Sequence, residues 1–153
     1  MNYKPIKEVR DQLKDFDCGN DDLNVYLKCF AYQNDKNGIG KTFVLFDNNQ
    51  LVGFMTLCSA SINFEEAPRG LNLPKYPIPA IKIARLAVDK RFQGKGYGKS
   101  AAEAAIQILK AASPEMPIKL ATEKGNEKAR RLYTSLGFRL LPELDGDDLV
   151  FGL

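Results

Sequence analysis

Residues 93–98 have the sequence Gln-Gly-Lys-Gly-Tyr-Gly, and they separate two segments with different apolar patterns. Residues 80–88 before them are apolar and typical of a strand, whereas residues 100–112 after them place apolar side chains at helical spacing. Glycines let the backbone approach an anion closely, and the first N–H groups of a helix have no acceptor within it. The stretch therefore predicts an anion-binding turn between a strand and a helix.

The charges around this turn favour an anionic ligand. Residues 90–102 include four basic side chains, Lys90, Arg91, Lys95 and Lys99, and no acidic one. A run of basic residues is often only a solvated surface. Its position beside three alternating glycines makes anion binding the better interpretation here.

The composition predicts one ordinary globular domain over residues 1–153. The chain is 44% hydrophobic and 27% charged, and its net charge is only +3. It has no apolar run long enough to cross a membrane, and no apolar signal-peptide segment follows residues 1–5. We therefore expect a cytoplasmic protein without a membrane partner. A net charge this small permits an anionic ligand or RNA but requires neither.

The cysteine and histidine counts argue against a metal centre or a disulfide framework. The chain has three cysteines, Cys18, Cys29 and Cys58, with no CxxC pair, and it has no histidine. We expect no metal cofactor and reduced thiols.

Hydrophobic periodicity and turn residues predict the order of the elements. A first helix begins at Asn20-Asp21-Asp22, ends near residue 33 and has Leu23, Tyr26, Leu27, Phe30 and Ala31 on its apolar face. A helix over residues 98–112 has an apolar face formed by Ala101, Ala102, Ala105, Ile108, Leu109 and Ala112. The other expected elements are strands 42–46, 51–59, 80–88, 118–122, 138–141 and 149–153, an exposed loop over 64–79, and a helix over 126–136 that Gly137 ends.

This order predicts a mixed sheet. The central strand-helix-strand-helix portion favours parallel pairing around a right-handed crossover, and the hairpins at each end favour antiparallel edges. The fold class is therefore α/β or α+β, with flanking helices.

Two other phosphate-binding motifs fit the glycine-rich stretch less well. Gly98-Lys99-Ser100 matches the end of a P-loop, but Gln93 occupies the position of that motif's first glycine. The spacing of glycines at 94, 96 and 98 also differs from the GxGxxG of dinucleotide-binding folds.

Three segments in this order resemble the GNAT superfamily of N-acetyltransferases. The first is Arg85-Leu86-Ala87-Val88-Asp89, and the second is Gln93-Gly94-Lys95-Gly96-Tyr97-Gly98, which matches the Arg/Gln-x-x-Gly-x-Gly/Ala signature. The third is Asn126-Glu-Lys-Ala129-Arg-Arg-Leu132-Tyr133-Thr-Ser-Leu136-Gly137-Phe138. The resemblance implies a single GNAT-like domain with a mixed sheet of about six to seven strands.

The resemblance implies acetyl-CoA as co-substrate. The loop amides would bind its diphosphate, Lys95 and Lys99 would add charge there or at the ribose phosphate, and the strand before the loop would pair with the pantetheine arm. Asn126 would either bind the cofactor or an ordered water, or cap its helix. The implied cofactor-binding residues are Leu86, Ala87, Val88, Gln93, Gly94, Lys95, Gly96, Tyr97, Gly98, Lys99 and Asn126.

Tyr133 is the catalytic residue that the resemblance implies. In the family, this tyrosine donates a proton to the departing thiolate of coenzyme A, which a phenol can do when the two are hydrogen-bonded. A core aromatic is the alternative. A general base, if one is needed, would have to be a carboxylate such as Glu65, Glu66 or Glu123, and none is assigned.

The acceptor amine remains open between several classes. Residues 16–27, Phe-Asp-Cys-Gly-Asn-Asp-Asp-Leu-Asn-Val-Tyr-Leu, and Tyr76-Pro77-Ile78-Pro79 resemble GNAT toxins that acetylate aminoacyl-tRNA. That resemblance implies aminoacyl-tRNA as acceptor and an antitoxin protein as partner. A small-molecule or protein amine, or a coenzyme A-binding module without catalysis, are the alternatives. Many relatives dimerise, so a homodimer is also expected.

Overall fold

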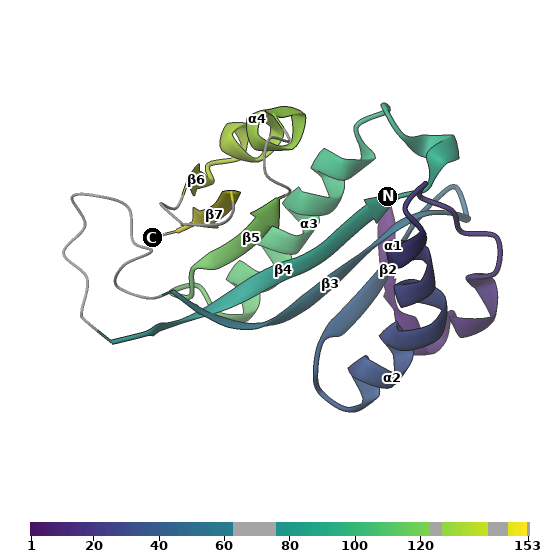
Figure 1. The fold of residues 1–153 in the computed structure, drawn as a ribbon, viewed down its shortest axis with the longest axis horizontal. Coiled ribbons are helices and arrows are strands. Elements are labelled where there is room, and N and C mark those ends of the chain that lie inside the picture. Colours follow the sequence, from purple (N-terminus) through teal and green to yellow (C-terminus); the bar gives the residue numbers. More distant parts are fainter. Residues whose placement is uncertain (63–75, 123–126, 141–146, 153) are drawn as a thin grey trace. The chain divides into compact units, whose positions relative to one another are not determined.

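A computed structural model of the protein describes residues 1–62, 76–122, 127–140 and 147–152 (Figure 1). In these residues seven strands form one sheet in the order β1-β2-β3-β4-β5-β7-β6. The strands are β1 (Asn2–Pro5), β2 (Lys41–Asp47), β3 (Gln50–Ile62), β4 (Ile78–Val88), β5 (Ile118–Thr122), β6 (Arg139–Leu140) and β7 (Asp147–Phe151).

The helices precede, follow and connect these strands. The longer ones are α1 (Asp21–Val25), the π-helix η3 (Tyr26–Phe30), α2 (Ala31–Lys36), α3 (Tyr97–Ala112) and α4 (Glu127–Ser135). Short 3₁₀ turns are η1 (Ile6–Glu8), η2 (Arg10–Gln12) and η5 (Lys90–Phe92).

The strand pairing confirms the expected mixed sheet. β4 pairs with β5 in parallel, and α3 lies between them in the sequence. β1 with β2, β2 with β3, β5 with β7 and β6 with β7 are antiparallel pairs. The parallel pair at the centre and antiparallel pairs towards the edges agree with the order of elements in the sequence.

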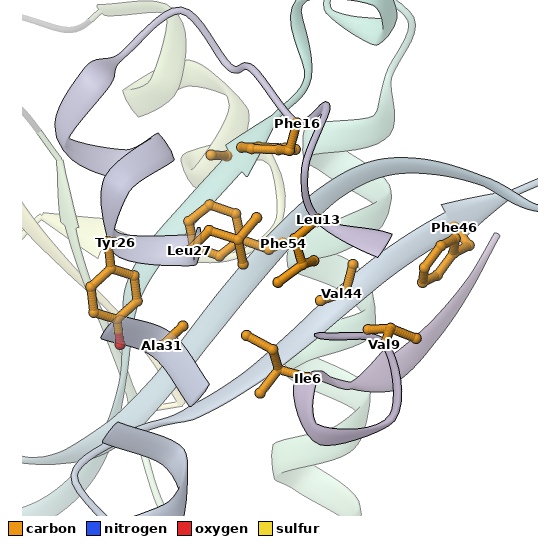
Figure 2. Close-up of a cluster of buried hydrophobic side chains, with 11 residues drawn as sticks. Ile6, Val9, Leu13, Phe16, Tyr26, Leu27, Ala31, Val44, Phe46 and Phe54 are labelled. Atoms are coloured by element: carbon orange, nitrogen blue, oxygen red, sulfur yellow. The ribbon is translucent and has the colours of Figure 1, made fainter. Parts of the chain in front are cut away.

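The chain divides into two compact units, and the first contains the glycine-rich loop. This unit comprises residues 1–58 and 84–104. Figure 2 shows its core, where the η1–η2 region and the helix of residues 21–36 place apolar side chains against β2 and β3. The buried members are Ile6, Val9, Leu13, Phe16, Tyr26, Leu27, Ala31, Val44, Phe46, Phe54 and Ala87.

The second unit comprises residues 59–83 and 105–153 and has its own packing. Tyr133 and Phe138 meet edge to face with 6.0 Å between ring centroids, and Phe138 also contacts Phe151. Gly137 has φ +103°, which confirms the predicted helix stop, and a Cβ there would lie 3.0 Å from the Phe151 ring.

A π-turn changes the face of the first helix. The Ala31 N–H donates to the Tyr26 carbonyl, five residues back, so the helix contains one extra residue at this point. Residues Tyr26, Leu27 and Ala31 are buried as predicted, but Phe30 is 54% exposed. The prediction for Phe30 was wrong because it assumed an uninterrupted α-helical period.

Three further expectations differ from the structure. β1 was not predicted, because it is short and mostly exposed and is held by its pairing with β2. β4 begins at Ile78, so Ile78 and Pro79 are strand residues rather than loop residues. Ala112 is exposed because it lies in the last turn of α3. Most of the expected loop lies outside the described residues.

Candidate active site

The glycine-rich loop joins η5 to α3, as the sequence predicts, and its three glycines are not equivalent. Gly94 and Gly96 have φ values of +78° and +87°, a conformation that other residues rarely adopt. Gly98 is the second residue of α3 and has no such requirement. A Cβ at any of the three would meet no protein atom within 4 Å. Neither backbone conformation nor protein packing therefore accounts for glycine at position 98.

The loop presents a row of unpaired donors. The Ser100 N–H donates to the Gly96 carbonyl at 3.1 Å, and the backbone N–H groups of residues 94–99 find no acceptor in the described part of the chain. Unpaired amides at a helix N-terminus attract anions, and the helix dipole adds to that attraction. The loop can therefore hold a phosphate or diphosphate group.

Asp89 anchors the start of the loop. Its carboxylate is buried and accepts hydrogen bonds from the Arg91 backbone N–H (3.0 Å), the Arg91 guanidinium (3.0 and 3.3 Å) and the Asp17 N–H (3.1 Å). Its own N–H donates to the Val52 carbonyl at 2.9 Å. Burial raises the pKa of Asp89, but these hydrogen bonds and the Arg91 charge outweigh burial and hold the pKa below its usual value.

The four cations of the predicted basic run have different surroundings. Lys90 forms an ion pair with Asp17 at 3.1 Å, and Arg91 forms one with Asp89 at 3.0 Å. Lys95 lies 5.8 Å from the centre of the Phe92 ring. Lys99 is exposed and forms no ion pair within the described ranges. Only Lys95 and Lys99 are therefore available to an anion bound at the loop.

The side chains of Gln93 and Tyr97 are used within the protein. The Gln93 Nε2 atom donates to the Cys18 carbonyl at 2.9 Å and to the Val88 carbonyl at 2.8 Å. The Tyr97 hydroxyl donates to Asp47 Oδ2 at 2.5 Å, which raises the pKa of the phenol. Two of the predicted ligand residues thus also hold the loop in place. The sequence did not indicate that Asp47 is the hydrogen-bond partner of Tyr97, because aspartate is common beside a hairpin turn.

β4 leads into the loop region and extends beyond its pairing with β5. Within the described residues its register with β5 covers Ile81–Ile83, whereas β4 continues to Val88. Ala87 is buried in the core shown in Figure 2, so Leu86 and Val88 face the opposite side of the sheet. Gly53 lets β3 and β4 approach closely, since a Cβ there would lie 2.5 Å from the Ala87 carbonyl.

Tyr133 lies on α4 in the second unit and is 8% exposed. Burial raises the pKa of its phenol, so the hydroxyl keeps its proton at neutral pH. Asn126 and the carboxylate candidates Glu65, Glu66 and Glu123 lie outside the described residues. The structure thus brings together the β4 and loop residues in one unit and places Tyr133 in the other.

The described residues contain no group of three or more His, Cys, Asp or Glu side chains arranged to hold a metal ion. None of the described helices is long and apolar enough to cross a membrane.

A mixed sheet with an anion-binding loop between β4 and α3 defines an α/β protein with a candidate phosphate-binding site, and sequence comparison identifies the family. The model of the Acetyltransferase (GNAT) family matches residues 8–138. The chain belongs to this family and is an N-acetyltransferase.

Several relatives carry more specific names. The tRNA-acetylating toxin of Mycobacterium tuberculosis (strain ATCC 25618 / H37Rv) is 30% identical over 135 residues, which cover 86% of this chain and 81% of the toxin. The structure of AtaT complexed with acetyl-methionyl-tRNAfMet has a TM-score of 0.86 and 27% identity, covering 99% of this chain and 94% of AtaT. A mutant AtaT toxin bound to the C-terminus of the antitoxin AtaR and acetyl-CoA has a TM-score of 0.76 and 26% identity, covering 98% and 91%.

Proposed function

We propose that the protein transfers the acetyl group of acetyl-CoA to the amino group of aminoacyl-tRNA, as the toxin of a toxin–antitoxin pair. The row of unpaired N–H groups at residues 94–99 carries the cofactor part of this proposal. A diphosphate has several acceptor oxygens and negative charge, which suit these donors together with Lys95 and Lys99. The remaining cofactor contacts would come from Leu86, Ala87 and Val88, and from Asn126.

The exposed edge of β4 suits the pantetheine arm. An extended chain with amide groups can add to a strand whose N–H and C=O groups are unpaired. Within the described residues the register of β4 with β5 ends at Ile83, so we take residues 84–88 as the edge to which the arm would add, and Leu86 and Val88 provide side chains on the face opposite the core.

Acetyl transfer then proceeds by direct attack. The nitrogen of the neutral acceptor amine forms a bond to the thioester carbonyl carbon, and the carbon–sulfur bond breaks. The departing sulfur takes the hydroxyl proton of Tyr133, the amine nitrogen releases a proton to solvent, and Tyr133 regains its proton from solvent before the next cycle. A buried phenol that stays protonated is a suitable donor to a thiolate.

Aminoacyl-tRNA suits this site chemically. Its amino group lies beside an ester and has an unusually acidic ammonium, so a neutral amine is available without a strong base. The relatives that acetylate tRNA or hold acetyl-methionyl-tRNAfMet support the same acceptor class, and the AtaT–AtaR structure supports an antitoxin partner. We further propose that residues 1–153 act as one cytoplasmic N-acetyltransferase domain.

Acceptor profiling tests this proposal. Purified protein is incubated with ¹⁴C-acetyl-CoA and a mixture of total aminoacyl-tRNA, polyamines, aminoglycosides and peptides with free N-termini. We expect label on aminoacyl-tRNA and none on deacylated tRNA. Label only on a small amine or a peptide would instead identify the alternative acceptor class. The Tyr133→Phe variant serves as the matched control for chemical, enzyme-independent acetylation.

A further inference from the structure

Residues 17–24, which precede and begin α1, form a compact polar segment that we call the clasp. The Asn24 side chain holds it together, because Oδ1 accepts from the Cys18 N–H and Nδ2 donates to Asp17 Oδ1, both at 2.9 Å. Asp17 Oδ1 also accepts from the Gly19 N–H at 2.9 Å, and Gly19 has φ +88°. These bonds make a closed turn of defined shape.

The clasp is bonded at four points to residues 89–93, the segment that leads into the glycine-rich loop. The Lys90 N–H donates to the Asp17 carbonyl at 2.8 Å, and the Asp17 N–H donates to Asp89 Oδ2 at 3.1 Å. Lys90 Nζ lies 3.1 Å from Asp17 Oδ2, and Gln93 Nε2 donates to the Cys18 carbonyl at 2.9 Å. Asp17 and Cys18 are thus joined to the loop through both backbone and side chains.

Residues 94–98, which we call the glycine tip, make few contacts with the rest of the described chain. A Cβ at Gly94, Gly96 or Gly98 would meet no protein atom within 4 Å, and the Gly96 carbonyl accepts from Ser100 within the start of α3. The position of the tip is therefore determined at its two ends: the segment that the clasp holds, and the start of α3, where Tyr97 bonds Asp47. A binding loop that is held in its bound conformation loses less entropy when the ligand arrives.

The clasp also connects this loop to the first helix. Asn20 Oδ1 accepts from the Leu23 N–H at 3.2 Å and caps α1, and Asn24 lies within α1. We propose that residues 17–24 are a positioning element that holds the loop in the conformation that binds the coenzyme A diphosphate. Binding at the loop in turn stabilises the clasp and the start of α1. This inference rests on the proposed function, since it takes the loop as the diphosphate site.

One variant removes clasp contacts without changing the loop. Asn24→Leu loses the bonds of the Asn24 side chain to Asp17 and Cys18, and position 24 lies on α1. Asn2→Leu, at an exposed position of β1, is the matched control. Each protein is compared by circular dichroism and by calorimetric titration with coenzyme A.

Asn24→Leu should bind coenzyme A about three- to tenfold more weakly, because it loses two hydrogen bonds that hold the clasp together. The KM for acetyl-CoA should rise by the same factor while kcat at saturation stays within about twofold. Asn2→Leu should behave as wild type. A folded Asn24→Leu protein with unchanged affinity would overturn the inference.

Amide hydrogen exchange on the wild-type protein gives a test that needs no variant. Coenzyme A should slow exchange both in residues 94–99 and in residues 17–24. Protection confined to the loop in the wild type would contradict stabilisation of the clasp and α1. Wild-type protein that binds no coenzyme A would contradict the proposed function, and this inference with it.

Discussion

The phenol of Tyr97 joins the first turn of α3 to the end of β2 by donating to Asp47 Oδ2 at 2.5 Å. Tyr97 lies between Gly96 and Gly98, so this bond sets the direction in which the helix and its unpaired N–H groups point. The ring also meets Phe92 edge to face at 5.9 Å between centroids. One side chain of the loop is thus held by the sheet on one side and by η5 on the other.

Tyr97→Phe should weaken coenzyme A binding about two- to fivefold while leaving the fold intact, because the ring contact with Phe92 remains and only one hydrogen bond is lost. Calorimetric titration measures the change, and Tyr3→Phe, at an exposed position on β1, is the control. Asp47→Asn should have a similar effect, and the double variant should be no worse than either single one. Additive losses would show that the two residues act separately.

Asp89→Asn should lower the free energy of unfolding by about 2 kcal/mol, because a buried charged acceptor of several hydrogen bonds is replaced by an amide that also carries donors. Urea unfolding followed by circular dichroism measures the loss. Asp11→Asn, at an exposed position of η2, should change stability by less than about 0.5 kcal/mol. Equal stability of both variants and the wild type would contradict the anchoring role of Asp89.

Acid should destabilise the wild-type protein through the same contacts. The pKa of Asp17 is held at about 2, first by the bond from Asn24 and then by the Gly19 N–H and Lys90, and the pKa of Asp89 is also lowered. A lowered folded pKa gives stabilisation that is complete above the unfolded value of 3.8 and is lost as pH falls towards the folded value. Urea midpoints should therefore fall between about pH 4 and pH 2, and less steeply in Asp89→Asn.

Tyr133→Phe should reduce kcat about 100-fold or more while acetyl-CoA affinity stays within twofold, because the variant keeps the buried ring and loses only the proton donor. Steady-state kinetics with the acceptor found by profiling, together with calorimetry, separate the two quantities. Tyr3→Phe is again the matched control. An unchanged kcat would show that Tyr133 is only a core aromatic beside Phe138.

The strand–loop–helix unit was predictable because its signals are local. Apolar periodicity and three glycines lie within one continuous stretch, and β4, the loop and α3 occur where they predict, with β4 starting two residues earlier. The exposed position of Phe30 was not predictable from the same reasoning, because a π-turn depends on how the helix packs and not on its own pattern. β1 exists only through pairing with a distant segment.

The candidate site was predictable in part for the same reason. The motif predicted that Gln93 and Tyr97 bind the cofactor. It did not predict that their side chains bond Cys18 and Asp47 within the protein. These partners are 75 and 50 residues away in sequence, so no local pattern reveals them. The sequence therefore identified the loop, and the structure identified what holds it.

Binding of acetyl-CoA by Gly98→Ala tests most directly whether the loop holds the coenzyme A diphosphate. A methyl group at this position meets no protein atom and replaces a helical glycine, so stability should stay the same or rise by up to about 1 kcal/mol. It would, however, occupy space that the diphosphate needs, so calorimetric titration should show affinity reduced about tenfold or more. A folded Gly98→Ala protein that binds acetyl-CoA as tightly as wild type would contradict the claim.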